Sequence, residues 1–255
     1  MTHPFFAGTQ HPRVFAHRGL TAGGLDSSMW ENTATAFAAA HAVGAEYIES
    51  DCQVTADGDV VLFHDETLER ITGDARRVSD VPTRELERMF ADHGGIMTVA
   101  EALSSFPDSR FNIDVKTLSA AEPVGPILAR HTERVLVTSF SDRNRLAAIE
   151  AVMRAGATLR PATSGGQSVI ARVRALSALR LAPGRLLRDI DALQIPERHA
   201  GLRILTPALL RAAHAHDVEV HVWTVNEPVD MQRLVDFGVD GIVTDRADLA
   251  VSTLY

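Results

Sequence analysis

Two histidines stand where hydrophobic runs of the sequence end. His17 closes the run Val14–His17, and His64 follows Leu62-Phe63. Histidine titrates near neutral pH, so two histidines flanking a scissile bond could act as general base and general acid. The chain has eleven histidines, and most histidines are exposed or are satisfied core residues. The polar residues directly after them, Arg18 and Asp65, favour a catalytic interpretation of these two.

Three carboxylates form a second group with a possible chemical role. Glu49 and Asp51 are two apart on a predicted strand, so their side chains point to the same face. Two carboxylates on one inward face repel each other unless a positive charge lies between them. A hard divalent cation, Mg²⁺ or Ca²⁺, would supply that charge, with Asp114 as a third oxygen ligand. Exposed carboxylates on an edge strand are the alternative, which the apolar neighbours Tyr47 and Ile48 disfavour.

Positive and aromatic residues near these groups could bind a phosphate ester. Arg18 can bind phosphate in a bidentate manner, and Gly19 would allow a close backbone approach. Lys116 shares a strand face with Asp114 and could add a second positive charge. Trp223, in the apolar run 218–225, could wall the substrate pocket, although most buried tryptophans only fill the core.

The elements that must position these residues alternate between strands and helices. This βα alternation predicts a parallel sheet with helices outside, and eight strands in 255 residues match a single (β/α)8 TIM barrel spanning residues 1–255. A doubly wound open sheet remains an alternative, because alternation does not show closure. The predicted strands are Val14–His17, Tyr47–Val54, Phe111–Val115, Val135–Phe140, Thr158–Pro161, Ala192–Ile195, Val218–Val225 and Ile242–Thr244.

Helix signals and one insertion complete this plan. Asn32-Thr33 can cap a helix that Gly44 ends, and Asn226 can cap another with Pro228 in its first turn. The alternation of strands and helices is interrupted around His64. There we expect a strand extension, Val60–Phe63, followed by a short insertion over the barrel mouth at about residues 66–109. Within it the pattern predicts two short helices, Arg84–Phe90 and Val99–Phe106.

Composition excludes several classes of function. The formal net charge is -8 and there is no block of Lys or Arg, so nucleic acid is not an expected partner. The one cysteine, Cys52, cannot form an internal disulfide. We find neither a signal-peptide pattern nor an apolar run of ~20 residues, so we expect a cytoplasmic protein without integral membrane association. The oligomeric state stays open.

Several segments together resemble the glycerophosphodiester phosphodiesterase family, within the TIM-barrel superfamily of phospholipase-C-like phosphodiesterases. The likeness covers about residues 14–249, nearly the whole chain. Each motif is weak alone, but their ordered series is specific. The segments are His17-Arg18-Gly19, Glu31-Asn32-Thr33, Glu49-Ser50-Asp51, His64-Asp65, Asn112-Ile113-Asp114-Val115-Lys116, Ser139-Phe140, Val222-Trp223-Thr224-Val225-Asn226 and Gly238-Val239-Asp240-Gly241-Ile242-Val243-Thr244-Asp245.

The resemblance implies a metal-dependent hydrolase with one divalent cation, Mg²⁺ or Ca²⁺, at the barrel mouth. It implies a catalytic pair, His17 and His64, which would cleave a small glycerophosphodiester to glycerol 3-phosphate and an alcohol. The other implied roles are metal binding by Glu49, Asp51 and Asp114, phosphate contacts by Arg18 and Lys116, and a pocket wall at Trp223.

Three departures from the family pattern concern the substrate more than the reaction. Asp114 stands where the family usually has Glu, Trp30 replaces the usual proline before Glu31 after a longer lead-in (Thr21–Trp30), and the insertion is short. One alternative is therefore a lysophospholipase-D-like or sphingomyelinase-D-like enzyme that forms a cyclic phosphate. Such an enzyme needs a membrane surface, for which Phe5-Phe6 is the only hint. A second alternative is a non-catalytic barrel that binds metal or phosphate.

Overall fold

Eight parallel strands form one sheet in the order in which they occur along the chain. The computed structural model describes residues 3–21 and 30–255. β1 pairs with β2 on one side and with the last strand, β11, on the other. Between β6 and β7 the contact is a single parallel bridge, Ser164 to Ala192, so the barrel is nearly closed. The strands are β1 Arg13–His17, β2 Tyr47–Val54, β4 Arg110–Val115, β5 Val135–Thr138, β6 Ala162–Thr163, β7 Ala192–Pro196, β10 Glu219–Trp223 and β11 Gly241–Thr244.

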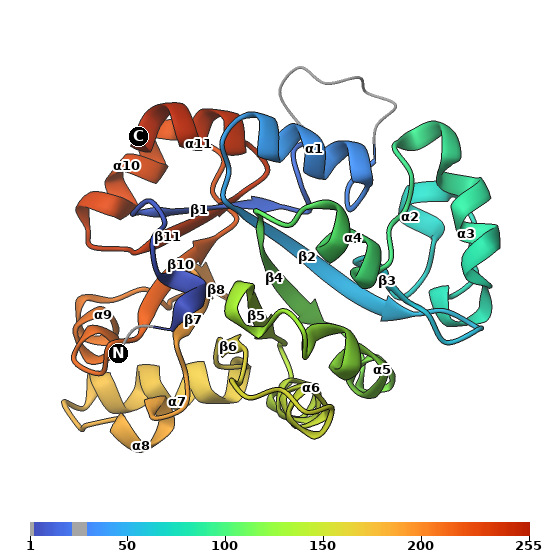
Figure 1. The fold of residues 1–255 in the computed structure, drawn as a ribbon. Coiled ribbons are helices and arrows are strands. Elements are labelled where there is room, and N and C mark those ends of the chain that lie inside the picture. Colours follow the sequence, from blue (N-terminus) through green and yellow to red (C-terminus); the bar gives the residue numbers. More distant parts are fainter. Residues whose placement is uncertain (1–2, 22–29) are drawn as a thin grey trace.

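Helices surround the sheet and connect successive strands (Figure 1). Parallel strands need such crossovers, and the result confirms the predicted (β/α)8 barrel. The strands are buried on both faces, as in β1, where Val14, Phe15 and Ala16 are at most 1% exposed. The outer helices are α1 Ala34–Ala42, α4 Val99–Ser105, α5 Leu118–Leu128, α6 Asp142–Arg154, α7 Gln167–Ala178, α9 Pro207–His214, α10 Pro228–Asp236 and α11 Ala247–Leu254, with a short α8 Gly184–Leu187 after α7.

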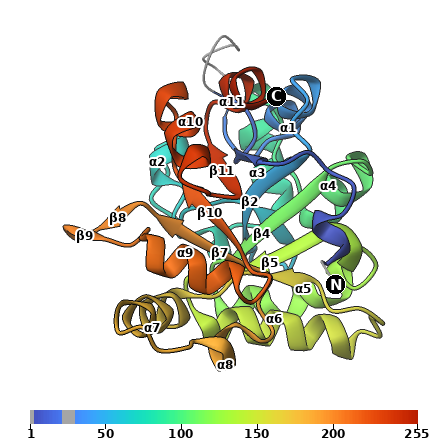
Figure 2. The ribbon, with the colours of Figure 1, turned by 90° about the vertical axis from the view of Figure 1, so that its left-hand side faces the viewer.

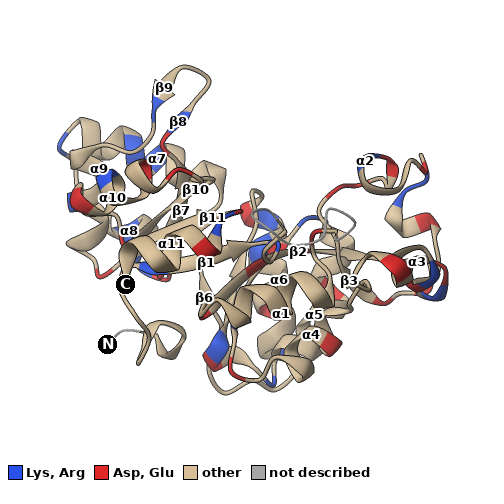
Figure 3. Ribbon diagram, turned by 90° about the horizontal axis from the view of Figure 1, so that it is seen from above, with Lys and Arg blue, Asp and Glu red and all other residues tan. Residues whose placement is uncertain are grey.

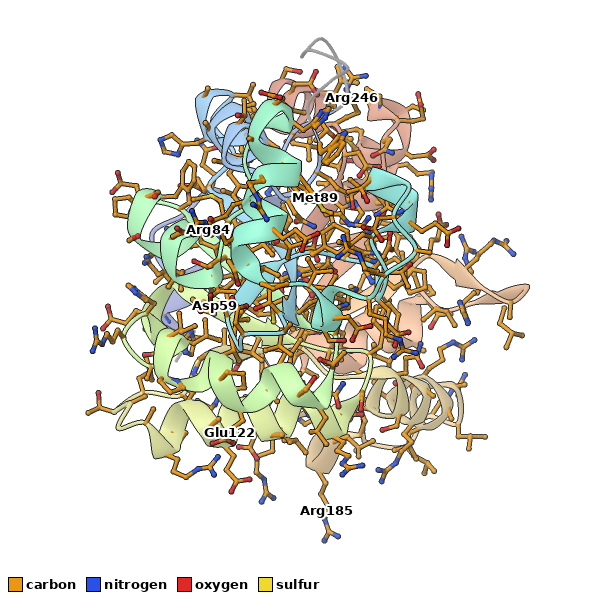
Figure 4. All side chains as sticks on the ribbon, turned by 90° about the vertical axis from the view of Figure 1, so that its right-hand side faces the viewer. Asp59, Arg84, Met89, Glu122, Arg185 and Arg246 are labelled. Atoms are coloured by element: carbon orange, nitrogen blue, oxygen red, sulfur yellow. The ribbon has the colours of Figure 1, made fainter. Side chains whose placement is uncertain are left out.

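A small subdomain extends from the carboxyl end of β2. Its elements are β3 (Val60–Leu62), which pairs antiparallel with β2, the short α2 (Glu69–Thr72), and α3 (Thr83–Phe90). Figure 4 shows this side of the molecule, with Met89 on α3. Its own apolar cluster consists of Val61, Phe63, Leu68, Val78, Val81, Leu86 and Phe90, with Trp30, Ile71, Met89 and Ile96 packed against it. By contrast, α4 packs against apolar residues of β2 and β4 in the barrel core. It therefore belongs to the barrel and not to this subdomain.

The N-terminal residues close the opposite end of the barrel. The 3₁₀ turn Pro4–Phe6 places Phe5 and Phe6 among Phe15, Tyr47 and other interior residues. Phe5 is 0% and Phe6 3% exposed, and the Tyr47 hydroxyl donates a hydrogen bond to the carbonyl of Phe5. Phe5-Phe6 are therefore core residues, which removes the one sequence hint of a membrane contact.

Two local predictions were wrong. The strand expected at Thr158–Pro161 is β6, Ala162–Thr163, because Pro161 has no N–H to donate to a sheet. Asn226 does not cap α10, whose N-cap is Glu227, because its side chain is bound elsewhere. Thr33 does cap α1 through the N–H of Ala36.

A hairpin that the sequence did not predict follows β7. Its strands, β8 (Arg198–His199) and β9 (Leu202–Arg203), are antiparallel, and they project away from the barrel (Figure 2). The lead-in before Trp30 falls mostly on residues 22–29, which lie outside the described residues. Among the helices of the described chain, none combines the length and the hydrophobicity needed to cross a bilayer.

Candidate active site

A cavity of about 430 Å³ opens at the carboxyl ends of the barrel strands. This is the end at which active sites of (β/α)8 barrels are found. Every site residue proposed from the sequence lines this cavity. They are His17, Arg18, Glu49, Asp51, His64, Asp114, Lys116 and Trp223.

The carboxylates come together because adjacent parallel strands are in register. His17 on β1 pairs with Glu49 on β2, and Asp51 pairs with Asp114 on β4. The Lys116 ammonium lies 2.6 Å from Asp51 Oδ1 and 2.7 Å from Asp114 Oδ2. Lys116 thus neutralises part of the charge that the two aspartates would otherwise leave buried, and these carboxylates raise its pKa although burial lowers it.

Burial and the neighbouring charges shift the pKa values of these three carboxyl groups in different directions. Desolvation, followed by the charge of Asp51, raises the pKa of Glu49 to about 8. Desolvation also acts on Asp51, but the positive charges of Lys116, His64 and Arg18 hold its pKa below the usual value. For Asp114, desolvation prevails and the pKa is raised. Near neutral pH this group of acids has an affinity for further positive charge.

His17 is held by a carboxylate from the last strand. Its Nδ1 lies 2.6 Å from Asp245 Oδ1, and its Nε2 is 3.9 Å from Glu49 Oε2. Asn226 fixes Asp245 by donating from Nδ2 to Oδ2 at 2.8 Å and by accepting the Asp245 N–H. Burial alone would lower the pKa of His17, but the Asp245 hydrogen bond and the charge of Glu49 raise it.

His64 has an equivalent support in its neighbour Asp65, whose Oδ1 lies 2.5 Å from His64 Nδ1. Arg70 from α2 donates from Nε to the other oxygen of Asp65 at 2.5 Å. Arg70 also forms a fork with Glu31, at 3.0 and 2.6 Å, and Glu31 accepts a 2.9 Å hydrogen bond from Arg18. A continuous chain of ion pairs therefore links Asp65, which contacts His64, to Glu31, which contacts Arg18.

A divalent cation fits the donor set at the base of the cavity. Glu49 Oε2, Asp51 Oδ2 and Asp114 Oδ1 are buried oxygens without a hydrogen bond. Buried acceptors of this kind are costly unless something positive satisfies them. In the conformation described, within residues 3–21 and 30–255, no three His, Cys, Asp or Glu side chains already form a ligand cluster. Lys116 contacts both aspartates in this conformation.

Gly19 contributes to packing as well as to the loop. Its φ is +88°, and a Cβ atom there would lie 2.8 Å from backbone atoms of Ala36 on α1. Because residue 19 is a glycine, the loop after β1 can contact the start of α1. This contact holds Arg18 in place, with its Nε 3.4 Å from Asp51 Oδ2. Trp223 is half-buried at the cavity wall, and its ring meets Phe140 edge to face at 5.8 Å.

Sequence reasoning missed the residues that hold His17, Asp65 and Arg18. Asp245 follows the apolar run of β11, and this position at a strand end could have identified it. Glu31 and Arg70 lie outside the strands, and only the folded chain brings them together. Glu31 and Asp245 belong to the segments of the family resemblance, but neither was proposed as a site residue.

Comparison with known sequences and structures gives one consistent family. Residues 17–249 match the sequence profile of the Glycerophosphoryl diester phosphodiesterase family. A probable glycerophosphodiester phosphodiesterase 2 of Mycobacterium tuberculosis is 39% identical over 242 residues, which cover 92% of this chain and 88% of that protein.

The fold is also shared with solved phosphodiesterase structures. The glycerophosphodiester phosphodiesterase of Thermotoga maritima superposes with a TM-score of 0.74 at 25% identity, covering 96% of this chain and 99% of the other. A phosphodiesterase of Oleispira antarctica, solved with the product sn-glycerol-3-phosphate, has a TM-score of 0.72 at 20% identity, with coverage of 96% and 97%.

Proposed function

Since this chain belongs to the glycerophosphoryl diester phosphodiesterase family, we propose that it hydrolyses small glycerophosphodiesters by metal-assisted acid–base catalysis. The products would be glycerol 3-phosphate and an alcohol. The observation that carries the proposal is the pair His17 and His64, which line one cavity with three carboxylates while Asp245 and Asp65 each hold an Nδ1 atom. This leaves Nε2 of each ring available for proton transfer.

The cation proposed for this site is Mg²⁺ or Ca²⁺, held by Glu49, Asp51 and Asp114. Members of the family generally use a divalent cation, and the three buried oxygens without a hydrogen bond are hard ligands that suit either ion. When bound, such an ion acts as a Lewis acid and offsets the negative charge that develops on the phosphate. Arg18 and Lys116, which both contact Asp51, add positive charge there.

The two histidines divide the proton transfers. One accepts the proton of the glycerol hydroxyl next to the phosphate as that oxygen attacks phosphorus, and the other protonates the oxygen of the leaving alcohol. A five-membered cyclic phosphate results. Water then opens the ring, the histidines exchange roles, and glycerol 3-phosphate is released. The Asp245 hydrogen bond raises the pKa of His17, so His17 keeps a proton to a higher pH than a free imidazole does.

The test is direct. Purified protein is incubated with glycerophosphocholine and Mg²⁺ or Ca²⁺, with an EDTA control, and phosphorus species are followed by NMR. We expect metal-dependent formation of glycerol 3-phosphate. A cyclic phosphate as the final product would favour the phospholipase-D-like alternative, and the absence of turnover with either ion would favour a non-catalytic binding protein.

A further inference from the structure

The active-site cavity has a second half that the proposed chemistry does not use. Beyond the charged residues on β1, β2 and β4, the cavity continues along β5–β7, α7 and the β8–β9 hairpin. Much of this half is apolar. Phe140, Ile170, Ala171, Ile204 and Trp223 line it.

Two of the segments that line this half, α7 and the β8–β9 hairpin, are joined by a hydrogen bond. Arg174 on α7 donates from Nε to the carbonyl of Arg203 on β9 at 3.2 Å, so the helix and the hairpin form one wall. Phe140, which is 52% exposed, and Trp223 also line this half, and their rings contact each other edge to face. An exposed phenylalanine beside a tryptophan at the mouth of a cavity marks an apolar binding surface.

The charge of this half does not suit a cationic group such as choline. No Asp or Glu is among the cavity-lining residues contributed by β5–β7, α7, the hairpin and β10 in the described chain. The positive charges there are Arg174 and, 5.7 Å over the Phe140 ring, the ammonium of Lys116. Figure 3 shows further basic residues on α7 and β9. A second cation would meet like charge and would compete with Lys116 for the aromatic face.

We propose that this half of the cavity is a subsite for an uncharged apolar chain of the diester substrate, bound between α7 and the Phe140–Trp223 pair. The inference rests on the proposed hydrolysis of glycerophosphodiesters and names the class of diester. The chain can belong to either side of the phosphate: an acyl group on the glycerol, or an alkyl group as the leaving alcohol.

Three diesters distinguish these sources. They are glycerophosphocholine, which lacks a chain, hexanoyl lysophosphatidylcholine, with a chain on the glycerol, and glycerophosphohexanol, with a chain on the alcohol. Each methylene group that becomes buried contributes roughly fourfold. We therefore expect kcat/KM for one chain-bearing diester to exceed that for glycerophosphocholine at least about tenfold. The preferred diester identifies the side on which the chain binds.

A variant blocks the subsite from its open edge. Ala171 is an exposed residue of α7 that lines the cavity, so Ala171→Trp should fill the space with an indole ring. The ratio of kcat/KM values, chain-bearing diester over glycerophosphocholine, should fall to about one. Ala178→Trp is the matched control, since Ala178 is exposed on the same helix and does not line the cavity. This control should keep the wild-type ratio.

Two outcomes would overturn the subsite while leaving the hydrolase function intact. In the first, kcat/KM for glycerophosphocholine equals or exceeds that for both chain-bearing diesters. In the second, Ala171→Trp leaves the ratio of kcat/KM values, chain-bearing diester over glycerophosphocholine, unchanged. If no diester is hydrolysed, calorimetric binding of hexyl phosphate and methyl phosphate decides the question separately. Tighter binding of hexyl phosphate that Ala171→Trp removes supports the subsite, and equal dissociation constants refute it.

Discussion

Asp245 Oδ1 lies 2.6 Å from Nδ1 of His17, which joins the end of the last strand of the barrel to the end of the first. The carboxylate needs its own support, and Asn226 provides it through two hydrogen bonds. A carboxylate on one ring nitrogen fixes the orientation of the imidazole and favours a lone pair or a transferable proton on the other. We therefore propose that Asp245 is a positioning residue for His17.

Asp245→Asn should lower kcat by about two to four orders of magnitude, because an amide can hold the ring in the wrong tautomer. The variant also removes an interaction that raises the pKa of His17. The limb of the pH–rate profile that reports His17 should then move to lower pH. Asp236→Asn, at an exposed end of α10, is the control. An unchanged profile would argue against this role for Asp245.

Loss of either histidine should strongly lower kcat without unfolding the barrel. His17→Ala and His64→Ala should each lower kcat by ~10²–10⁴-fold, the usual contribution of a positioned acid or base. Thermal unfolding should show that both variants remain folded. Near-native rates in both would refute the acid–base mechanism.

Arg70 should matter for turnover more than for stability. Its side chain is 47% exposed, so its ion pairs with Asp65 and Glu31 add at most about 1 kcal/mol to folding. Arg70→Met would release the groups that hold His64 and Arg18. Since small misplacements of catalytic groups cost as much as ~10²-fold, we expect a fall in kcat/KM of about tenfold or more.

The control for Arg70→Met is Arg154→Met, which breaks an exposed ion pair with Glu122 on the outside of the barrel. It should leave both kcat/KM and the unfolding temperature near the wild-type values. Equal kinetics in the two variants would mean that Arg70 is only a surface residue.

Glu219 should make stability depend on pH in the acid range. It accepts from Arg13 at 3.0 Å and lies 3.0 Å from Nε2 of His221. Burial would raise the pKa of Glu219, but the His221 and Arg13 interactions lower it to about 2 from 4.5. The stabilisation is therefore present above pH 4.5 and is lost as the pH falls toward 2.

Glu219→Gln should accordingly cost about 3 kcal/mol of unfolding free energy at pH 7. The difference between wild type and variant should narrow as the pH falls from 5 to about 3 in urea titrations. Glu150→Gln, at an exposed position of α6, should show no such difference. A difference in unfolding free energy between wild type and Glu219→Gln that stays constant with pH would contradict the assigned ionisation of Glu219.

Phe5→Ala tests whether the N-terminal turn belongs to the core. Phe5 is fully buried, with its ring 5.1 Å from that of Tyr47. Truncating a buried phenylalanine costs about 3–5 kcal/mol, which chemical denaturation would measure. A loss below about 1 kcal/mol would show that the turn adds little to the barrel.

The barrel and the centre of the site were predictable because each depends on short-range patterns. Alternation along β2 places Glu49 and Asp51 on one face, and parallel pairing then brings Asp114 beside Asp51. The same reasoning fails where an element is too short to show a pattern. β6 has two residues, and the strand was expected a few residues too early, at Thr158–Pro161.

The supports of the site were less accessible to sequence reasoning because they depend on distant contacts. Arg70 bridges Asp65, five residues away, and Glu31, thirty-nine residues away. The hairpin of β8 and β9 has exposed residues on both strands, so no hydrophobic pattern in the sequence predicts it. Its place beside the cavity follows only from the folded arrangement.

The turn at Pro4–Phe6 also has a consequence for the order in which the chain can fold. Phe5 and Phe6 pack against residues that extend from Phe15 to Val243, near the two ends of the barrel sequence. During synthesis this turn leaves the ribosome before most of the side chains that will cover it. Phe5 and Phe6 therefore lack their final partners until β11 has been made, so this turn reaches its native surroundings only late in synthesis.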